Sequence, residues 1–171
     1  MRTWVLPTII AVVTSLVLAG CGGDSVAFVN PDENVEDGEW IATADFWLTN
    51  GTERFKMLAH DDASGEDTFI AFNPSLAVLS ADVTDTGEFD VQWLEAVDGC
   101  GADIFGDSGT YTRTNSQIVA TTPDVNGEHT TLTCNFLSAT RMRVQVKSIE
   151  VSDSETETWR GTFIAEKGTD W

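Results

Sequence analysis

The sequence predicts an all-β protein: an antiparallel meander of about eight short strands that closes into a small barrel. Three observations predict it. Apolar and polar residues alternate with a period of two in several stretches, residues typical of tight turns separate those stretches, and no stretch after residue 20 has a convincing helical period. A two-sheet β-sandwich is the alternative arrangement of the same strands.

The clearest element is a hairpin over residues 39–60. Apolar side chains occupy every second position from Trp40 to Leu48, which indicates a strand with one buried face. The alternation resumes from Arg54 to His60. Between the two stretches, Asn50-Gly51 favours a two-residue turn because both residues tolerate a positive φ.

That turn fixes the expected pairing across the hairpin, and each predicted pair is chemically compatible. The apolar pairs on one face are Phe46 with Phe55, Ala44 with Met57, and Ala42 with Ala59. The pairs on the other face are Trp47 with Arg54, a cation–π contact, and Asp45 with Lys56, an ion pair.

The remaining strand candidates follow in series along the chain. They are Phe69–Phe72, Leu76–Val83, Phe89–Val97, Thr110–Thr122, Thr130–Leu137, Arg141–Val151 and Thr158–Ala165. Turn residues separate several of them, as at Asp85-Thr86-Gly87 and Asn126-Gly127.

The candidate Arg141–Val151 has a two-faced pattern. Its predicted inward residues are Met142, Val144 and Val146, and its predicted outward basic row is Arg141, Arg143 and Lys147. The basic row would pair with acidic neighbours on adjacent strands, or else present a surface for anions.

The order of the strands and the Gly109-Thr110-Tyr111 stretch are similar to those of bacterial lipocalin-like barrels. The resemblance implies a barrel whose interior or mouth holds a small apolar ligand. The aromatic residues that would line such a site are Trp40, Phe46, Phe55, Trp93, Trp159 and Phe163. The same side chains could instead fill the core, because eight-stranded barrels either hold one ligand or are filled. The protein would then be a non-catalytic structural or protein-interaction module.

The first residues predict where the protein is sent. Arg2 precedes an apolar stretch from Val5 to Leu18, which as a helix would reach about 21 Å and fall short of the roughly 30 Å hydrocarbon core. A secretory signal peptide over residues 1–20 explains this layout better than a membrane span. Leu18-Ala19-Gly20-Cys21 resembles the lipobox of bacterial lipoproteins, which implies cleavage before Cys21 and lipidation of its thiol.

The resemblance also implies a location and a layout for the mature protein. Gly22, rather than Asp, follows the lipidated cysteine, which implies the outer membrane of a Gram-negative envelope. Residues 21–38 are predicted to be a flexible acidic tether, and residues 39–171 a single domain. The alternative is an ordinary secretory signal with an incidental Cys21.

Charge and cysteines limit the partners. The chain carries a formal net charge of −19, which disfavours binding to nucleic acid and to anionic lipid head groups. Cys100 and Cys134 are the thiols that remain after lipidation of Cys21, and in an oxidising compartment they predict one disulfide. A metal site made by both thiols with His129 is the alternative.

No catalytic residue and no cofactor is predicted. Gly106-Asp107-Ser108-Gly109 looks like the nucleophile motif of trypsin-like proteases, but the chain is too short for their two barrels, so a turn between strands is expected there. His60 and His129 are expected to be solvated. The acidic residues of the loop Asp61–Asp67 could bind calcium, although their spacing does not follow an EF-hand loop.

Overall fold

The structure, a computed structural model, describes residues 37–75, 85–97, 101–114, 116–152 and 155–168. These residues form twelve β-strands. The strands are β1 Gly38–Ala42, β2 Phe46–Asn50, β3 Glu53–Met57, β4 His60–Asp61, β5 Glu66–Asp67, β6 Phe69–Pro74, β7 Asp85–Val97, β8 Gly101–Thr114, β9 Gln117–Thr121, β10 His129–Ser138, β11 Arg141–Val151 and β12 Thr156–Lys167. Within these ranges there is no helix that could cross a membrane.

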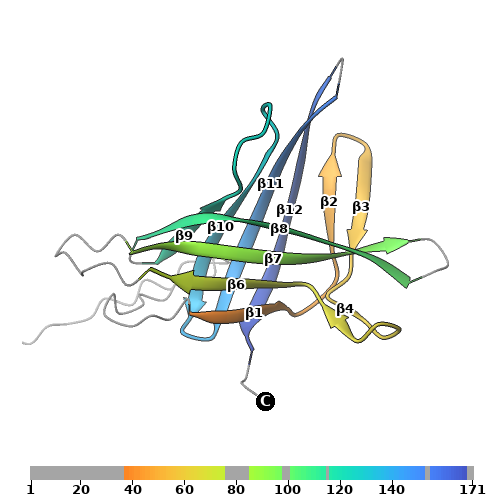
Figure 1. Ribbon diagram of the computed structural model, residues 1–171. Helices are drawn as coiled ribbons and strands as arrows, with labels where there is room; N and C mark the ends of the chain where they lie inside the picture. Colours follow the sequence, from red (N-terminus) through yellow and green to blue (C-terminus); the bar gives the residue numbers. More distant parts are fainter. Residues whose placement is uncertain (1–36, 76–84, 98–100, 115, 153–154, 169–171) are drawn as a thin grey trace, which may run out of the picture.

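Ten of the strands form one antiparallel sheet that closes on itself (Figure 1). The strands from β6 to β12 pair in chain order, and β1 closes the ring by pairing with both β12 and β6. The β2–β3 hairpin extends the ring, since β2 pairs with β12 and β3 with β7. With β1–β2 and β3–β6 each counted as one interrupted strand, the ring has eight strands. The predicted antiparallel barrel is therefore confirmed over the sandwich.

The predicted hairpin forms, but its turn lies one residue further along the chain. Asn50 pairs with Glu53, so the turn is Gly51-Thr52, with Gly51 at a φ of +59°. A glycine with positive φ at the first turn position suits a type II′ turn. Phe46 consequently pairs with Met57 rather than with Phe55.

The inward face of the hairpin is the predicted one, because the pairing slips by two residues and side chains alternate with a period of two. The two predicted charged contacts also form, as diagonal neighbours. The Arg54 guanidinium lies 4.4 Å from the centroid of the Trp47 ring, and Lys56 Nζ lies 2.6 Å from Asp45 Oδ2. Ala44 is exposed rather than buried, since the strand is interrupted at residues 43–45.

Two other expectations about strands were wrong. The chain turns after Thr114, so Thr110–Thr122 is not one strand but the end of β8 and the whole of β9. The motif at residues 106–109 is not a turn but lies inside β8, because β8 pairs with β7 without interruption from Gly101 to Arg113. The candidate Leu76–Val83 lies outside the described residues.

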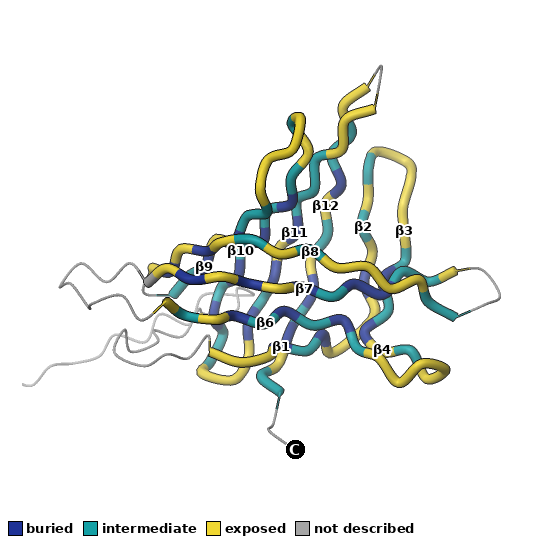
Figure 2. Tube along the Cα trace, viewed as in Figure 1, coloured by how far each residue is buried: buried dark blue, intermediate teal, exposed yellow. Residues whose placement is uncertain are grey.

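One end of the barrel is filled by side chains, which form the core there. Its fully buried apolar residues are Trp40, Ile70, Phe72, Phe89, Ile118, Ala120, Leu132, Cys134, Phe136, Met142, Val144 and Ala165. Trp40 meets Phe136 edge to face, with ring centroids 5.7 Å apart. Figure 2 shows the buried positions alternating along the strands in this part, whereas the outer ends of the β2–β3 and β11–β12 hairpins are largely exposed.

The strand β11 has the predicted limits and faces. Met142, Val144 and Val146 are buried, and Arg141 is exposed with its Nε 3.6 Å from Glu166 Oε1 on β12. The basic row therefore lies on the outside of the barrel, and one of its members has the predicted acidic neighbour.

The surroundings of Cys134 do not support the predicted disulfide. Its thiol is free and buried, and burial raises its pKa to about 12. Cys134 pairs with Ile118, which in turn pairs with Arg113 near the end of β8. Cys100 itself lies outside the described residues.

Candidate functional site

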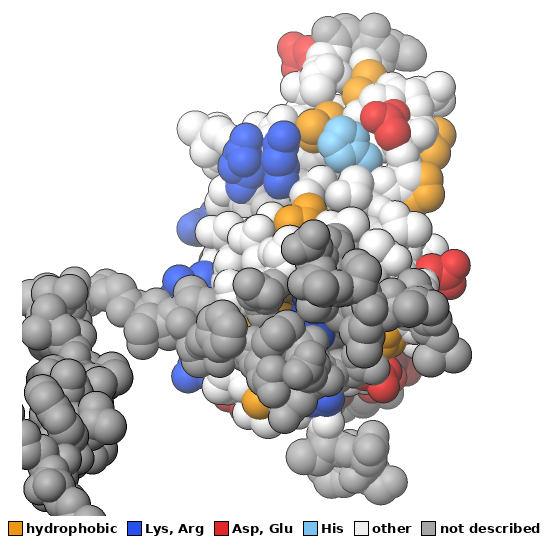
Figure 3. Space-filling model, turned by 90° about the vertical axis from the view of Figure 1, so that its left-hand side faces the viewer, with side chains coloured by type: hydrophobic (Ala, Val, Ile, Leu, Met, Phe, Trp, Pro, Cys, Tyr) orange, Lys and Arg blue, Asp and Glu red, His pale blue; other side chains and the backbone are white. Residues whose placement is uncertain are grey.

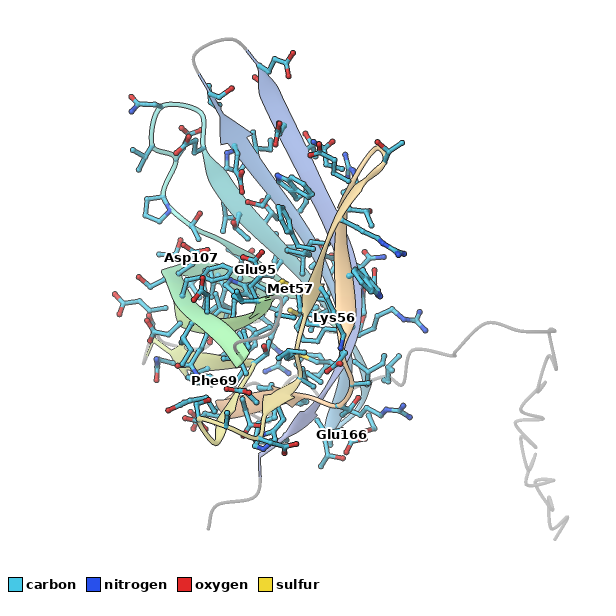
Figure 4. The ribbon with its side chains drawn as sticks, turned by 90° about the vertical axis from the view of Figure 1, so that its right-hand side faces the viewer. Lys56, Met57, Phe69, Glu95, Asp107 and Glu166 are labelled. Carbon is cyan, nitrogen blue, oxygen red and sulfur yellow. The ribbon has the colours of Figure 1, made fainter. Side chains whose placement is uncertain are left out.

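The other end of the barrel is hollow. A cavity of about 650 Å³ opens there between the β2–β3 hairpin, β7, β8, the connection from β9 to β10, β11 and β12. Figure 4 looks toward this side and shows the hairpin standing beside β11 and β12, with β7 and β8 across from them. The barrel thus has a filled end and an open mouth.

The floor of the cavity is an aromatic cluster. Phe46 stacks on Phe163 with centroids 4.4 Å apart, and Trp93 packs against them at 6.3 and 6.2 Å. All three are at most 5% exposed. Since each such pair adds about 0.5–1.5 kcal/mol beyond the burial of its area, the floor is a fixed platform. Of the three rings, that of Trp93 lines the cavity.

One wall is formed by Trp159 of β12 and Phe55 of β3, whose ring centroids lie 4.6 Å apart. Trp159 is only 3% exposed, whereas Phe55 is 44% exposed. The indole N–H of Trp159 is buried and has no hydrogen-bond acceptor among the described residues. A buried donor without a partner costs about 1–3 kcal/mol, so an acceptor brought by a ligand or by water would stabilise this wall.

Gly161 sets the position of the hairpin that carries this wall. A Cβ atom at Gly161 would lie 2.8 Å from the carbonyl oxygen of Trp47 and 2.6 Å from Leu48 Cδ2. The backbone of β2 therefore crosses β12 more closely than any larger residue would allow.

The opposite wall comes from β8 and the chain after β9. Phe105 pairs directly with Trp93 and is 43% exposed. Among the described residues, Gly101–Gly109 has strand partners only on the β7 side, because β9 begins to pair with β8 at Thr110. The connection from β9 to β10 closes this side of the mouth, and its Thr122, Pro123 and Val125 line the cavity.

A few polar groups interrupt the apolar lining. The hydroxyls of Thr130 and Ser148 hydrogen-bond to each other at 3.0 Å, and the Thr130 N–H donates to Thr122 Oγ1 at 2.8 Å. These groups satisfy one another and hold β10 and β11 against the β9 connection. His129 also lines this side: its Nδ1 is buried without a hydrogen bond to the described residues and lies 3.6 Å from Asp124 Oδ2, so His129 is not solvated as expected.

Four carboxylates also line the mouth: Glu95, Asp107, Glu128 and Glu150. Glu128 Oε1 accepts a hydrogen bond from the Val151 N–H at 3.2 Å. Glu95 and Asp107 are half-buried, and the carboxylate of neither makes a hydrogen bond or ion pair within the part of the chain that the structure describes. No Lys or Arg is among the described residues that line the cavity.

The six predicted aromatic residues divide into three groups. Phe55, Trp93 and Trp159 line the cavity, whereas Phe46 and Phe163 support Trp93 from below. Trp40 is not part of the site, since it packs against Phe136 in the filled end.

The aromatic lining residue that sequence reasoning missed is Phe105; the four carboxylates of the lining were not predicted either. Phe105 was missed because residues 106–109 were expected to be a turn. Had residues 101–109 been predicted as a strand, the period of two would have placed Phe105 on the same face as Asp107 and Gly109, which is the inward face.

The acidic loop lies apart from the cavity, on the small β4–β5 hairpin. Asp61 Oδ2 accepts a hydrogen bond from Ser64 Oγ at 2.8 Å, which lowers the pKa of Asp61. Asp67 binds His60 Nδ1 at 2.8 Å and thereby raises the pKa of His60. Among the described residues, no three His, Cys, Asp or Glu side chains are grouped as a metal site would require.

No protein-family model matches the chain, and no curated protein matches it. Solved structures of low sequence identity are similar to it. A redesigned β-barrel is 12% identical, with 79% of this chain and 93% of that chain covered and a TM-score of 0.43. EF1p2_mFAP2b bound to DFHBI is 14% identical, with 78% and 94% covered and a TM-score of 0.49. The S-type phycobiliprotein lyase CPES from Guillardia theta is 6% identical, with 80% and 90% covered and a TM-score of 0.48.

Proposed function

We propose that the protein is a lipocalin-like binding protein that holds a small, mainly apolar ligand in the mouth of its barrel. The observation that carries the proposal is the cavity of about 650 Å³, which is walled by aromatic rings although the other end of the same barrel is filled. Small-molecule sites are typically concave, about 300–1,000 Å³ in volume and largely apolar, with a few polar groups that orient the ligand. The unpaired indole N–H of Trp159 is one such group.

A structural or protein-interaction module with a filled core is less well supported. In such a module the inward aromatics would pack against one another throughout. Here Phe55 and Phe105 leave more than 40% of their surfaces exposed at the mouth. Burial of such rings by a ligand would contribute favourably to binding, at about 25 cal/mol per Å² of apolar surface.

Binding rather than catalysis is proposed for this site. Ser108, Thr130 and Ser148 line the cavity, but none of these hydroxyls is hydrogen-bonded to a histidine or carboxylate within the described residues. An adjacent base of this kind is the usual means by which a serine or threonine nucleophile is activated.

We also propose the location that the sequence predicts. Lipidation of Cys21 and anchoring to the outer membrane are part of this proposal, and residues 1–36 lie outside the described residues. β1 begins at Gly38, which pairs with Phe72 in the filled end. A membrane anchor that precedes β1 would therefore hold the domain by that end and leave the mouth accessible.

The test is a fluorescence titration with N-phenyl-1-naphthylamine, a neutral dye that brightens in apolar sites. The protein used is the full chain with Cys21→Ser, called the unlipidated variant below. We expect saturable binding of one dye per chain. Substitution of Phe105→Ser should weaken it about fivefold, which corresponds to about 1 kcal/mol.

Ile104→Ser is the matched control. Ile104 is adjacent to Phe105 on β8 and is 50% exposed, but it lies on the outer face and does not line the cavity. Its substitution should leave dye binding unchanged. An absence of saturable binding, or equal weakening by both substitutions, would contradict the proposed function.

A further inference from the structure

We infer that the ligand of the cavity is an organic cation, an apolar or aromatic body that carries an ammonium group. This inference rests on the proposed function and names its ligand class. It depends on two independent features of the mouth, its charges and its aromatic lining.

The charges of the mouth have one sign. Glu95, Asp107, Glu128 and Glu150 reach it from β7, β8, the connection between β9 and β10, and β11. The described residues of the lining include no Lys or Arg. Basic side chains instead gather on an outer flank of the barrel (Figure 3). A fatty-acid carboxylate would therefore meet four like charges and no Lys or Arg, and the His129 of the lining lies beside another carboxylate, with its Nδ1 3.6 Å from Asp124 Oδ2.

Glu95 and Asp107 are the two carboxylates placed to meet a ligand charge. Trp93 pairs with Phe105, Glu95 follows Trp93 by two residues, and Asp107 follows Phe105 by two residues on the antiparallel strand. The carboxylates therefore lie at opposite ends of the Trp93–Phe105 pair and on the same face of the sheet. Figure 4 shows both of them on the side of β7 and β8 that is next to Met57.

The aromatic lining favours the same kind of group. An ammonium is attracted to the face of an aromatic ring, and most strongly to that of tryptophan. Over the Trp93–Phe105 pair, an ammonium would also have a carboxylate on either side. The ammonium would thereby be the counter-ion of Glu95 and Asp107, which have none among the described residues.

Trp159 supplies the independent sign that the cavity takes a ligand. Its side chain is 97% buried, it lines the cavity, and its N–H has no acceptor among the described residues. A hydroxyl or carbonyl oxygen on the ligand body would satisfy this donor. The unpaired N–H of Trp159 is thus an observation separate from the charges of the four carboxylates.

The experiment compares three compounds with one body and three charges. 4-Phenylbutylammonium, 4-phenylbutanol and 4-phenylbutanoate are titrated calorimetrically into the unlipidated variant at pH 7 and low salt. We expect the ammonium to bind most tightly and the carboxylate most weakly, with at least a tenfold difference between them. The difference should narrow with added salt, since salt screens the interaction.

Two double variants with the same change in net charge locate the effect. Glu95→Gln with Asp107→Asn should remove the advantage of the ammonium, while binding of the alcohol stays the same. Glu88→Gln with Asp90→Asn should keep that advantage, because both residues are exposed on the outer face of β7.

The outcomes separate this inference from the proposed function. Saturable dye binding together with equal affinities for the three compounds, or tighter binding of the carboxylate, overturns the inference and leaves the binding function intact. Equal effects of the two double variants assign the preference to the overall charge, and they also overturn it. Failure of the dye and of all three compounds to bind overturns both.

Discussion

Replacing a phenylalanine in the filled end of the barrel should affect mainly stability, whereas replacing one at the mouth should affect mainly binding. Phe89 on β7 is fully buried in the filled end, whereas Phe55 on β3 is 44% exposed at the mouth. We expect Phe89→Ala to lower the free energy of unfolding severely. We expect Phe55→Ala to lower it little and to weaken binding of the naphthylamine dye instead.

The magnitudes follow from what each ring contacts. The Phe89 ring covers Gly109 on β8, where a Cβ atom would lie only 2.9 Å from Phe89 Cε1. Gly109 has no side chain that could fill the space left by the ring, and Phe89 is fully buried, so the cost of a buried Phe→Ala substitution applies, about 3–5 kcal/mol. Phe55 would lose a partly exposed area and its contact with Trp159, about 1 kcal/mol in all.

The assay is urea unfolding of the unlipidated variant followed by circular dichroism, together with the dye titration. A loss of 3–5 kcal/mol is a large part of the 5–15 kcal/mol that stabilises a typical domain. Equal destabilisation by the two substitutions would refute the division into a filled end and an open mouth. So would dye binding that is insensitive to Phe55→Ala.

Three further outcomes are expected. The hydrogen bond from Lys56 is the largest cause that lowers the pKa of Asp45, and a hydrogen bond from the Ala59 N–H lowers it further. The ionised carboxylate therefore stabilises the fold above the ordinary pKa of 3.8. This stabilisation is lost as the pH falls through the lowered pKa. Asp45→Asn should therefore lower the free energy of unfolding at pH 7. The loss should be less than about 1 kcal/mol, because the side chains of Lys56 and Asp45 are both more than 40% exposed. At pH 2 the urea unfolding curves with and without this substitution should coincide. Burial raises the pKa of the Cys134 thiol to about 12. In the unlipidated variant that also carries Cys100→Ser, a thiol reagent should therefore label Cys134 only after unfolding, and rapid labelling of the folded protein would contradict its position. A Cβ at Gly161 would meet the β2 backbone at 2.8 Å, so Gly161→Ala should displace the hairpin and change the dye affinity several-fold, whereas unchanged affinity would argue against this hairpin as a wall.

Alternation along the chain was enough to predict the barrel. The faces of Phe46 and Met57 and the limits of β11 follow directly from a period of two. The register of the hairpin did not follow, because Asn50-Gly51 and Gly51-Thr52 both make acceptable two-residue turns and the two registers bury the same face.

The site could be predicted only in part. Its residue types were identified, but alternation shows which side chains face inward and not how far they are from one another. Trp40 and Trp159 are both inward and almost completely buried, yet one closes against Phe136 and the other borders a cavity. This difference depends on the crossing of β2 over β12 and on the point at which β9 begins to pair. Both are properties of strands far apart in the sequence.

The one-sided pairing of Gly101–Gly109 has a consequence for the range of molecules that the protein can hold. In a barrel with every strand paired on both sides, the circumference is fixed by its hydrogen bonds, and a larger guest must break some of them. Along this stretch of β8 the described residues have only the β7 ladder to keep. A guest that projects between this edge of β8 and the connection from β9 to β10 therefore breaks no β8–β9 hydrogen bond, so this side limits the size of the contents less than a continuous ladder would.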